Sequence, residues 1–193
     1  MTEDLYEDTL IEKKVTILLN HSNSALSGSK IKMGQPLQFL VLHCLATPEG
    51  RDVTKSDLTK WHLGEPPVGR GWKQYGYRAF IHLNGDIEYL IDNNDDDTVD
   101  PWEISNGVAG INSISNHISY AGGLAKDGKT PKDTRTPSQY ASMAGFVLDF
   151  VKKHPQVKVA GHYHFANKAC PSFDVEKFCE EIGVPEKNIY RKK

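Results

Sequence analysis

The feature that most constrains the fold is a nearly continuous apolar run at residues 37–46, Leu-Gln-Phe-Leu-Val-Leu-His-Cys-Leu-Ala. Strict alternation of apolar and polar residues would indicate a strand with one solvated face, whereas an almost unbroken apolar run is typical of a strand buried on both faces. His43 is the polar residue near the C-terminal end of this run. We therefore predict a buried strand that ends close to a histidine.

Three helices are predicted after this strand in the sequence. Residues 54–63 resemble a helix that opens with a capping box at Thr54. Thr136 followed by Pro137 gives an N-cap with proline at the first helical position, and apolar residues then repeat at i, i+3, i+4 and i+7. A closing helix is expected before Gly183. These helices would cover the faces of a sheet.

Further strands complete that sheet. Residues 75–91 form a hairpin pattern around Asn84-Gly85, which predicts an antiparallel pair. Another strand is expected from Ile118, and a short one at residues 157–160 ends at Gly161-His162. The polar stretch at residues 92–116 lacks the spacing of a calcium-binding EF-hand and is interpreted as a solvated loop. The predicted fold is a single α/β domain with a central mixed β-sheet flanked by α-helices.

The first 36 residues differ from the rest. They begin with acidic side chains, contain one short apolar strand at residues 14–19, and continue as a Ser-rich stretch of linker type. We divide the chain into an N-terminal extension of unknown role, residues 1–36, and a folded domain, residues 37–193. A chain of 193 residues with 38% hydrophobic content suits one such domain.

Charge and hydropathy exclude some functions. The net charge is -2, with 23 basic and 25 acidic side chains intermixed, so no field attracts a polyanion and nucleic acid is not expected as a partner. The apolar run at residues 15–19 is far shorter than the core of a signal peptide, and the segment before it is acidic. We expect a monomer that is synthesised in the cytoplasm without a signal peptide and does not insert into membranes.

Two of the eight histidines stand out. His43 and His162 each lie at the C-terminal end of a predicted strand, where their side chains would share a cleft if the strands are neighbours. The others, apart from His164, lie in linker, helix, hairpin, loop and helix-end contexts, where solvated or hydrogen-bonded imidazoles are expected. This second group is His21, His62, His82, His117 and His154.

A pair of histidines at a cleft suggests zinc, because catalytic zinc takes three protein ligands and keeps a fourth position open. Cys170 can return to the cleft from eight positions beyond His162. His164 is a rival third ligand, since residues two apart on a strand share a face. Cys44 and Cys179 are interpreted as buried core residues.

A series of short motifs then gives a resemblance. In order they are Leu42-His-Cys-Leu-Ala-Thr, Gly71-Trp72, Gly76-Tyr77, Asn84-Gly85, Gly122-Gly123, Thr136-Pro137, Gly161-His162 and Lys168-Ala-Cys-Pro-Ser-Phe-Asp. This order, over residues 38–182, resembles that of the type 2 N-acetylmuramoyl-L-alanine amidases. The likeness is greatest to the small lysozyme-like amidases of bacteriophages, and the family also contains the peptidoglycan recognition proteins.

The resemblance implies a metal site and a set of catalytic residues. It makes His43, His162 and Cys170 the zinc ligands and leaves His164 as a residue that could touch substrate. It also makes Tyr77 a catalytic tyrosine beside the metal. The implied catalytic lysine is Lys168, and loop aromatics that could contact the substrate are Trp72, Tyr75 and Trp102.

The function that the resemblance implies is zinc-dependent hydrolysis of the amide between N-acetylmuramic acid and L-alanine in peptidoglycan. A phage or prophage endolysin, or an exported effector, would act on the cell wall after release or export. One alternative is a recognition module on the same fold that binds peptidoglycan without cutting it, although non-catalytic members typically lack the cysteine ligand. Another is an envelope assembly component whose zinc is purely structural.

Overall fold

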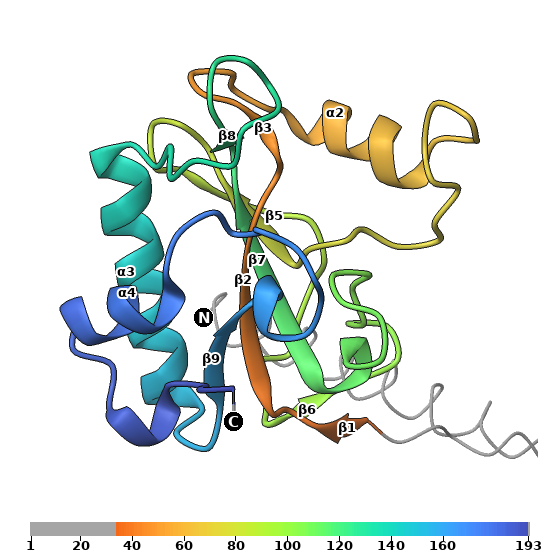
Figure 1. Ribbon diagram of the computed structural model, residues 1–193. Helices are drawn as coiled ribbons and strands as arrows, with labels where there is room; N and C mark the ends of the chain where they lie inside the picture. Colours follow the sequence, from red (N-terminus) through yellow and green to blue (C-terminus); the bar gives the residue numbers. More distant parts are fainter. Residues whose placement is uncertain (1–33, 193) are drawn as a thin grey trace, which may run out of the picture. The chain divides into compact units, whose positions relative to one another are not determined.

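A computed structural model describes residues 34–192, which belong to one compact unit. Its centre is a five-stranded sheet in the order β5-β4-β7-β2-β9 (Figure 1). The strands β4, β7, β2 and β9 run parallel, and β5 is antiparallel to β4, so the sheet is mixed as predicted. Their bounds are Phe39–Cys44 for β2, Ala79–Ile81 for β4, Ile87–Tyr89 for β5, Ser115–Tyr120 for β7 and Lys158–Gly161 for β9.

Two short strand pairs extend the domain. β1 (Gln35–Pro36) pairs antiparallel with β6 (Thr98–Val99), and β3 (Thr47–Pro48) pairs parallel with β8 (Gly123–Leu124). The predicted strand at residues 14–19, like the rest of the extension up to residue 33, lies outside the described residues.

The predicted helices form at the expected places. α2 (Lys55–Leu58) continues as a π-helical turn, η2 (Thr59–Leu63), and begins with a capping box between Thr54 and Asp57. α3 (Pro137–Lys153) begins with a second capping box, and α4 (Val175–Glu181) is capped by an aspartate. Local side-chain chemistry therefore sets all three helix starts. Three 3-10 turns are η3 (Asn112–Ile114), η4 (His162–His164) and η5 (Glu186–Asn188).

The two faces of the sheet differ in what covers them. On one face, Leu40, Leu42 and Cys44 of β2 pack in a core cluster with residues of α3 and α4, such as Val147 and Phe178. Both helices lie on the same side of the sheet in Figure 1. Because side chains alternate along a strand, His43 must point to the opposite face. The predicted core positions of Cys44 and Cys179 are confirmed, since they are 4% and 0% exposed.

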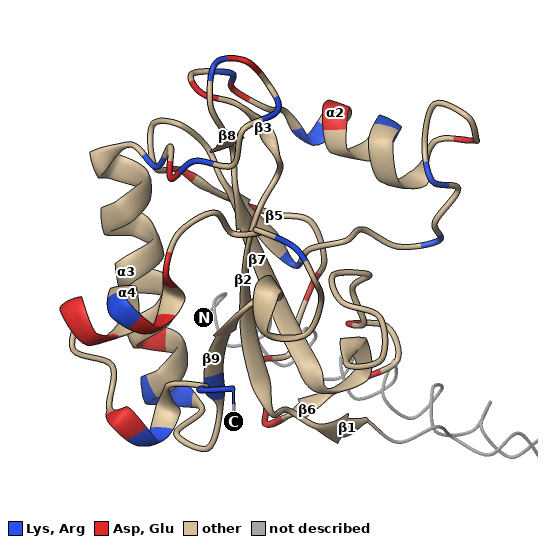
Figure 2. Ribbon diagram, in the orientation of Figure 1, with Lys and Arg blue, Asp and Glu red and all other residues tan. Residues whose placement is uncertain are grey.

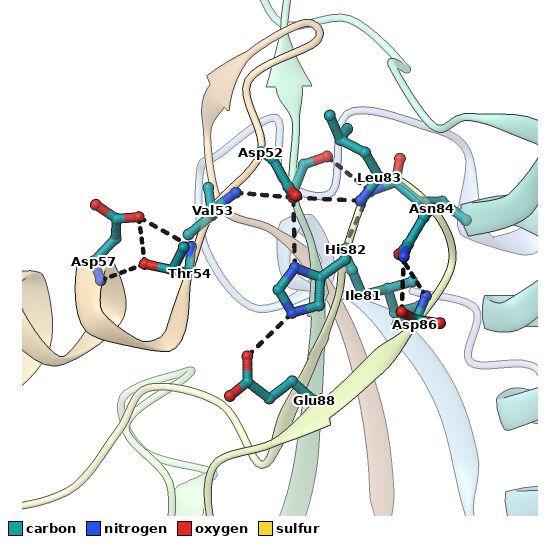
Figure 3. A network of polar contacts seen from close by, with 12 residues as sticks. Asp52, Val53, Thr54, Asp57, Ile81, His82, Leu83, Asn84, Asp86 and Glu88 are labelled. Carbon is teal, nitrogen blue, oxygen red and sulfur yellow. Dashed lines mark hydrogen bonds and ion pairs between the residues drawn. The ribbon is translucent and has the colours of Figure 1, made fainter.

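The turn between β4 and β5 contacts the segment that precedes α2. It spans residues 82–86, and Gly85 alone among its residues has a positive φ, at 94°. The turn is therefore longer than a two-residue turn with positive φ at both central positions. His82 lies between two carboxylates, 3.4 Å from Asp52 and 3.0 Å from Glu88 (Figure 3). This network holds the chain just before α2 against the hairpin.

Charges of both signs are interspersed over the domain, with Lys, Arg, Asp and Glu close together on α4 and on the loops near β3 and β8 (Figure 2). The longest described helix, α3, has 17 residues. Within residues 34–192, no helix is both long and apolar enough to span a membrane.

Candidate metal centre

Strand register brings His43 and His162 together. β2 and β9 are adjacent and parallel, with Leu42 opposite Gly161, so the next residues of both segments emerge side by side. The centres of the two imidazole rings are 4.8 Å apart. The predicted shared cleft at the C-terminal strand ends is thus present.

Cys170 reaches the same place from the loop after η4. Its Sγ lies 3.6 Å from Nδ1 of His43 and accepts a hydrogen bond from the backbone N–H of Cys44 at 3.3 Å. The backbone N–H of Tyr163 donates to the Cys170 carbonyl and ties the loop back to η4. One potential ligand atom each from His43, His162 and Cys170 falls within 4.8 Å of the others.

The electrostatics of this group suit a cation with nitrogen and sulfur ligands. Burial holds the pKa of His43 well below its usual value, and burial together with Lys168 lowers the pKa of His162 to about 4. Both imidazoles are therefore neutral at pH 7 and keep a lone pair for a metal. A hydrogen bond with the side-chain thiol of Cys44, together with burial, raises the pKa of the Cys170 thiol, so its thiolate needs the charge of a bound cation.

His164 does not join the group. Its Nδ1 accepts the backbone N–H of Gly161 at 3.0 Å, and its Nε2 lies 3.2 Å from the Glu176 carboxylate. His162 and His164 would share a face on a strand, but residues 162–164 form a 3-10 turn in which residues two apart do not share a face. The side chain is 4% exposed and does not line the cleft described next.

A cleft of about 740 Å³ is lined by His162 and Cys170 of this group, while His43 is buried. Tyr77, just before β4, lines it, with its ring centre 5.1 Å from that of His43. Burial raises the pKa of the Tyr77 phenol, so the phenol stays protonated and can donate a hydrogen bond. Lys168 also lines the cleft from the exposed loop between His162 and Cys170.

One wall of the cleft is aromatic and carries a positive charge. Trp72 stacks on His62 with ring centres 5.3 Å apart, and the Arg70 guanidinium lies 5.1 Å from the centre of the Trp72 ring. The backbone N–H of Gly76 donates to Nδ1 of His62 at 3.3 Å, which leaves the ring proton on Nε2. Such a wall can contact both the apolar and the anionic parts of a ligand.

The other predicted aromatic contacts lie elsewhere. The Tyr75 hydroxyl is 2.8 Å from the Thr59 hydroxyl, and Trp102 is 50% exposed; neither lines the cleft. Trp61 packs against a separate cluster of buried residues that includes Leu58 and Phe80, and it also lines the cleft.

His117 was not expected at the site, because the sequence pattern placed it in a loop ahead of a strand beginning at Ile118. β7 instead begins at Ser115, so His117 lies within the strand and is 0% exposed. Its Nδ1 is 3.0 Å from Nε2 of His43. A signal was present, since His117 and Ser119 alternate with Ile118 and Tyr120 at the period of a strand.

Fold and site together define a class, a mixed α/β domain with a two-histidine, one-cysteine site at the ends of parallel strands. The sequence narrows this class, because residues 33–173 match the family described as N-acetylmuramoyl-L-alanine amidase. The chain belongs to the N-acetylmuramoyl-L-alanine amidase family, and its activity is that of a peptidoglycan amidase. The resemblance seen in the sequence is therefore confirmed.

Several curated relatives are phage endolysins. The chain is 31% identical to the endolysin of Enterobacteria phage K11 over 147 residues, covering 76% of this chain and 87% of the relative. It is 25% identical to the endolysin of Escherichia phage T7 over 152 residues, covering 79% and 91%.

Solved structures share the fold. The Ph2119 endolysin from Thermus scotoductus bacteriophage Ph2119 superposes with a TM-score of 0.58 at 20% identity, covering 85% of this chain and 96% of that one. Drosophila PGRP-LB superposes with a TM-score of 0.55 at 19% identity, covering 86% and 94%.

Proposed function

We propose that the protein is a zinc-dependent endolysin of a phage or prophage, and that His43, His162 and Cys170 hold the zinc ion. The observation that carries the proposal is the convergence of three donor atoms within 4.8 Å, on residues two of which line a cleft. Two neutral imidazoles and one cysteine are a donor set that zinc prefers. With His164 engaged elsewhere, three protein ligands leave one coordination position for catalysis.

The bond to be cut is the amide between N-acetylmuramic acid and L-alanine. When bound, zinc would supply Lewis acidity toward the amide carbonyl and would activate water. Tyr77 contributes a protonated phenol, which can donate a hydrogen bond to the oxygen that gains negative charge in the transition state. Lys168 contributes a positive charge at the rim of the cleft, where it favours the same developing charge.

The aromatic wall would orient the substrate. Trp72 offers a flat apolar surface to a sugar ring or a peptide side chain, and Arg70 offers a cation to a carboxylate of the stem peptide. Enzyme action is favoured over a pure recognition role because the cleft contains Cys170 and Tyr77 together.

The test is a digestion of purified peptidoglycan sacculi followed by mass spectrometry. We expect about one zinc per chain, free stem peptides that begin with L-alanine, and no new reducing sugar ends. Cys170→Ser serves as the matched control and should bind little zinc and release no peptides. New reducing ends would identify a glycosidase instead, and undigested sacculi that retain the zinc-loaded protein would identify a recognition module.

A further inference from the structure

His117 lies on β7 beside β2, two register positions before His43. β7 runs parallel to β2, with His117 opposite Val41 and Ser119 opposite His43. Val41 and His43 share a face because they are two residues apart on one strand. His117 therefore points to the same face as His43, underneath the metal centre.

The two imidazoles are joined by a buried hydrogen bond. Nε2 of His43 and Nδ1 of His117 are 3.0 Å apart, while the side chains are 1% and 0% exposed. The other nitrogen of His43, Nδ1, is the one that lies 3.6 Å from the sulfur of Cys170. His43 thus directs one nitrogen at the metal centre and the other at His117.

This division of roles fixes where the protons must be when a metal is bound. A neutral imidazole has one N–H, and a nitrogen that binds a metal must present a lone pair. If Nδ1 of His43 binds the metal, its proton resides on Nε2 and is donated to Nδ1 of His117. His117 must then carry its own proton on its Nε2.

Packing holds the His117 ring in this position. A Cβ atom added at Gly107 would lie only 2.4 Å from Nδ1 of His117, so the ring rests directly against the glycine backbone. Gly107 does not have a positive φ, so the close approach, not backbone conformation, is what favours a glycine here. Within the described residues, Nε2 of His117 has no hydrogen-bond partner.

An unpartnered buried N–H costs free energy, and an apolar side chain at this position would avoid that cost. We propose that His117 is a positioning residue for the metal ligand His43: it accepts the Nε2 proton and so reserves Nδ1 for the ion. Residues of this kind hold a ligating histidine in one tautomer and one orientation. The inference rests on the proposed zinc site.

Two substitutions separate the hydrogen bond from packing. His117→Leu has a similar size but no acceptor, so it leaves the Nε2–H of His43 buried and unpaired. Asparagine in His117→Asn can place an oxygen near the position of Nδ1 and restore an acceptor. We expect the zinc dissociation constant to rise by about 10- to 100-fold in His117→Leu and by much less in His117→Asn.

Zinc affinity would be measured by competition with a chromophoric chelator, on proteins whose fold is checked by circular dichroism. His154→Leu is the matched control, because His154 is equally buried at 2% exposure but lies at the end of α3 and contacts Asp97. This control should keep the zinc affinity of the wild type. Equal zinc affinities in His117→Leu and wild type, or equal losses in His117→Leu and His117→Asn, would overturn the inference.

A spectroscopic test needs no variant. Nitrogen-15 NMR of the zinc-loaded wild-type protein should show protonated Nε2 atoms in both His43 and His117, with Nδ1 of His43 shifted by the metal. A proton on Nδ1 of His43 in that state would refute the role of His117. A wild-type protein that binds no zinc would contradict the proposed function. Failure of the inference about His117 would instead leave zinc binding by the wild type intact and would appear only in the comparison of the variants.

Discussion

His164 donates a hydrogen bond from Nε2 to the Glu176 carboxylate over 3.2 Å, while its Nδ1 accepts the N–H of Gly161. Both ring nitrogens are thus used inside the protein, and Glu176 is itself bound by Arg191 at 2.6 Å. Through Glu176, the histidine links η4 to α4 and to Arg191 of the C-terminal segment. This arrangement gives His164 a structural role two residues from His162, a proposed zinc ligand.

The first prediction separates Cys170 from His164. Cys170→Ser should fold and lose zinc affinity by well over about 100-fold, because it removes the only sulfur ligand of the site, a larger change than loss of a supporting residue. His164→Ala should keep about one zinc per chain and lose about 1–3 kcal/mol of unfolding free energy, since it leaves buried polar groups unpaired. Zinc content and urea unfolding measure the two effects, and the reverse pattern would move the third ligand to His164.

The second prediction concerns Tyr77. Tyr77→Phe should keep its zinc and its KM but lose about 10²- to 10³-fold in kcat, as expected when one donor to a developing oxyanion is removed. The phenol is protonated at neutral pH because burial raises its pKa, so the wild-type activity should show no fall from Tyr77 ionisation between pH 7 and 9. Steady-state release of stem peptides measures both quantities. An unchanged kcat would exclude the phenol from the reaction.

The parts of the site that could be predicted are those fixed by regular structure. His43 and His162 follow strands, and the carboxyl ends of adjacent parallel strands meet at one edge of a sheet. The helix starts at Thr54 and Thr136 could also be predicted, because capping depends on residues only three positions apart.

The remaining parts depend on tertiary contacts. The resemblance to the family favoured Cys170 over His164, because neighbouring residues alone could not reveal that η4 is a 3-10 turn. The start of β7 was missed because Asn116 and His117 are polar, and only the surrounding strands show that they are buried. Loop aromatics such as Trp102 take positions set by contacts with distant segments, for example the hydrogen bond from Gln74 to its carbonyl.

The third prediction compares a tryptophan that lines the cleft, Trp72, with one that does not, Trp102. Trp72→Ala should raise KM for peptidoglycan fragments about 2- to 10-fold, because it removes an aromatic contact worth about 0.5–1.5 kcal/mol from the wall of the cleft. Trp102→Ala, a matched control outside the cleft lining, should leave KM unchanged. A larger rise in KM for Trp102→Ala would place the substrate along the loop at residues 92–112 instead.

The last prediction tests how α2, which supports the wall residues Trp61 and His62, depends on pH. Hydrogen bonds from the backbone N–H and the hydroxyl of Thr54 lower the pKa of the Asp57 carboxyl in the folded protein. As the pH falls, the Asp57 carboxyl is therefore protonated first in the unfolded chain. The stabilisation by Asp57 is complete above about pH 4 and is lost as the pH falls through the lower pKa of the folded protein.

Asp57→Ala should be less stable than wild type by about 0.3–1.5 kcal/mol at pH 7, and the difference should shrink toward pH 2. Urea unfolding of both proteins across this range measures the difference. A difference that does not change with pH would mean that the charge of Asp57 contributes nothing to the cap.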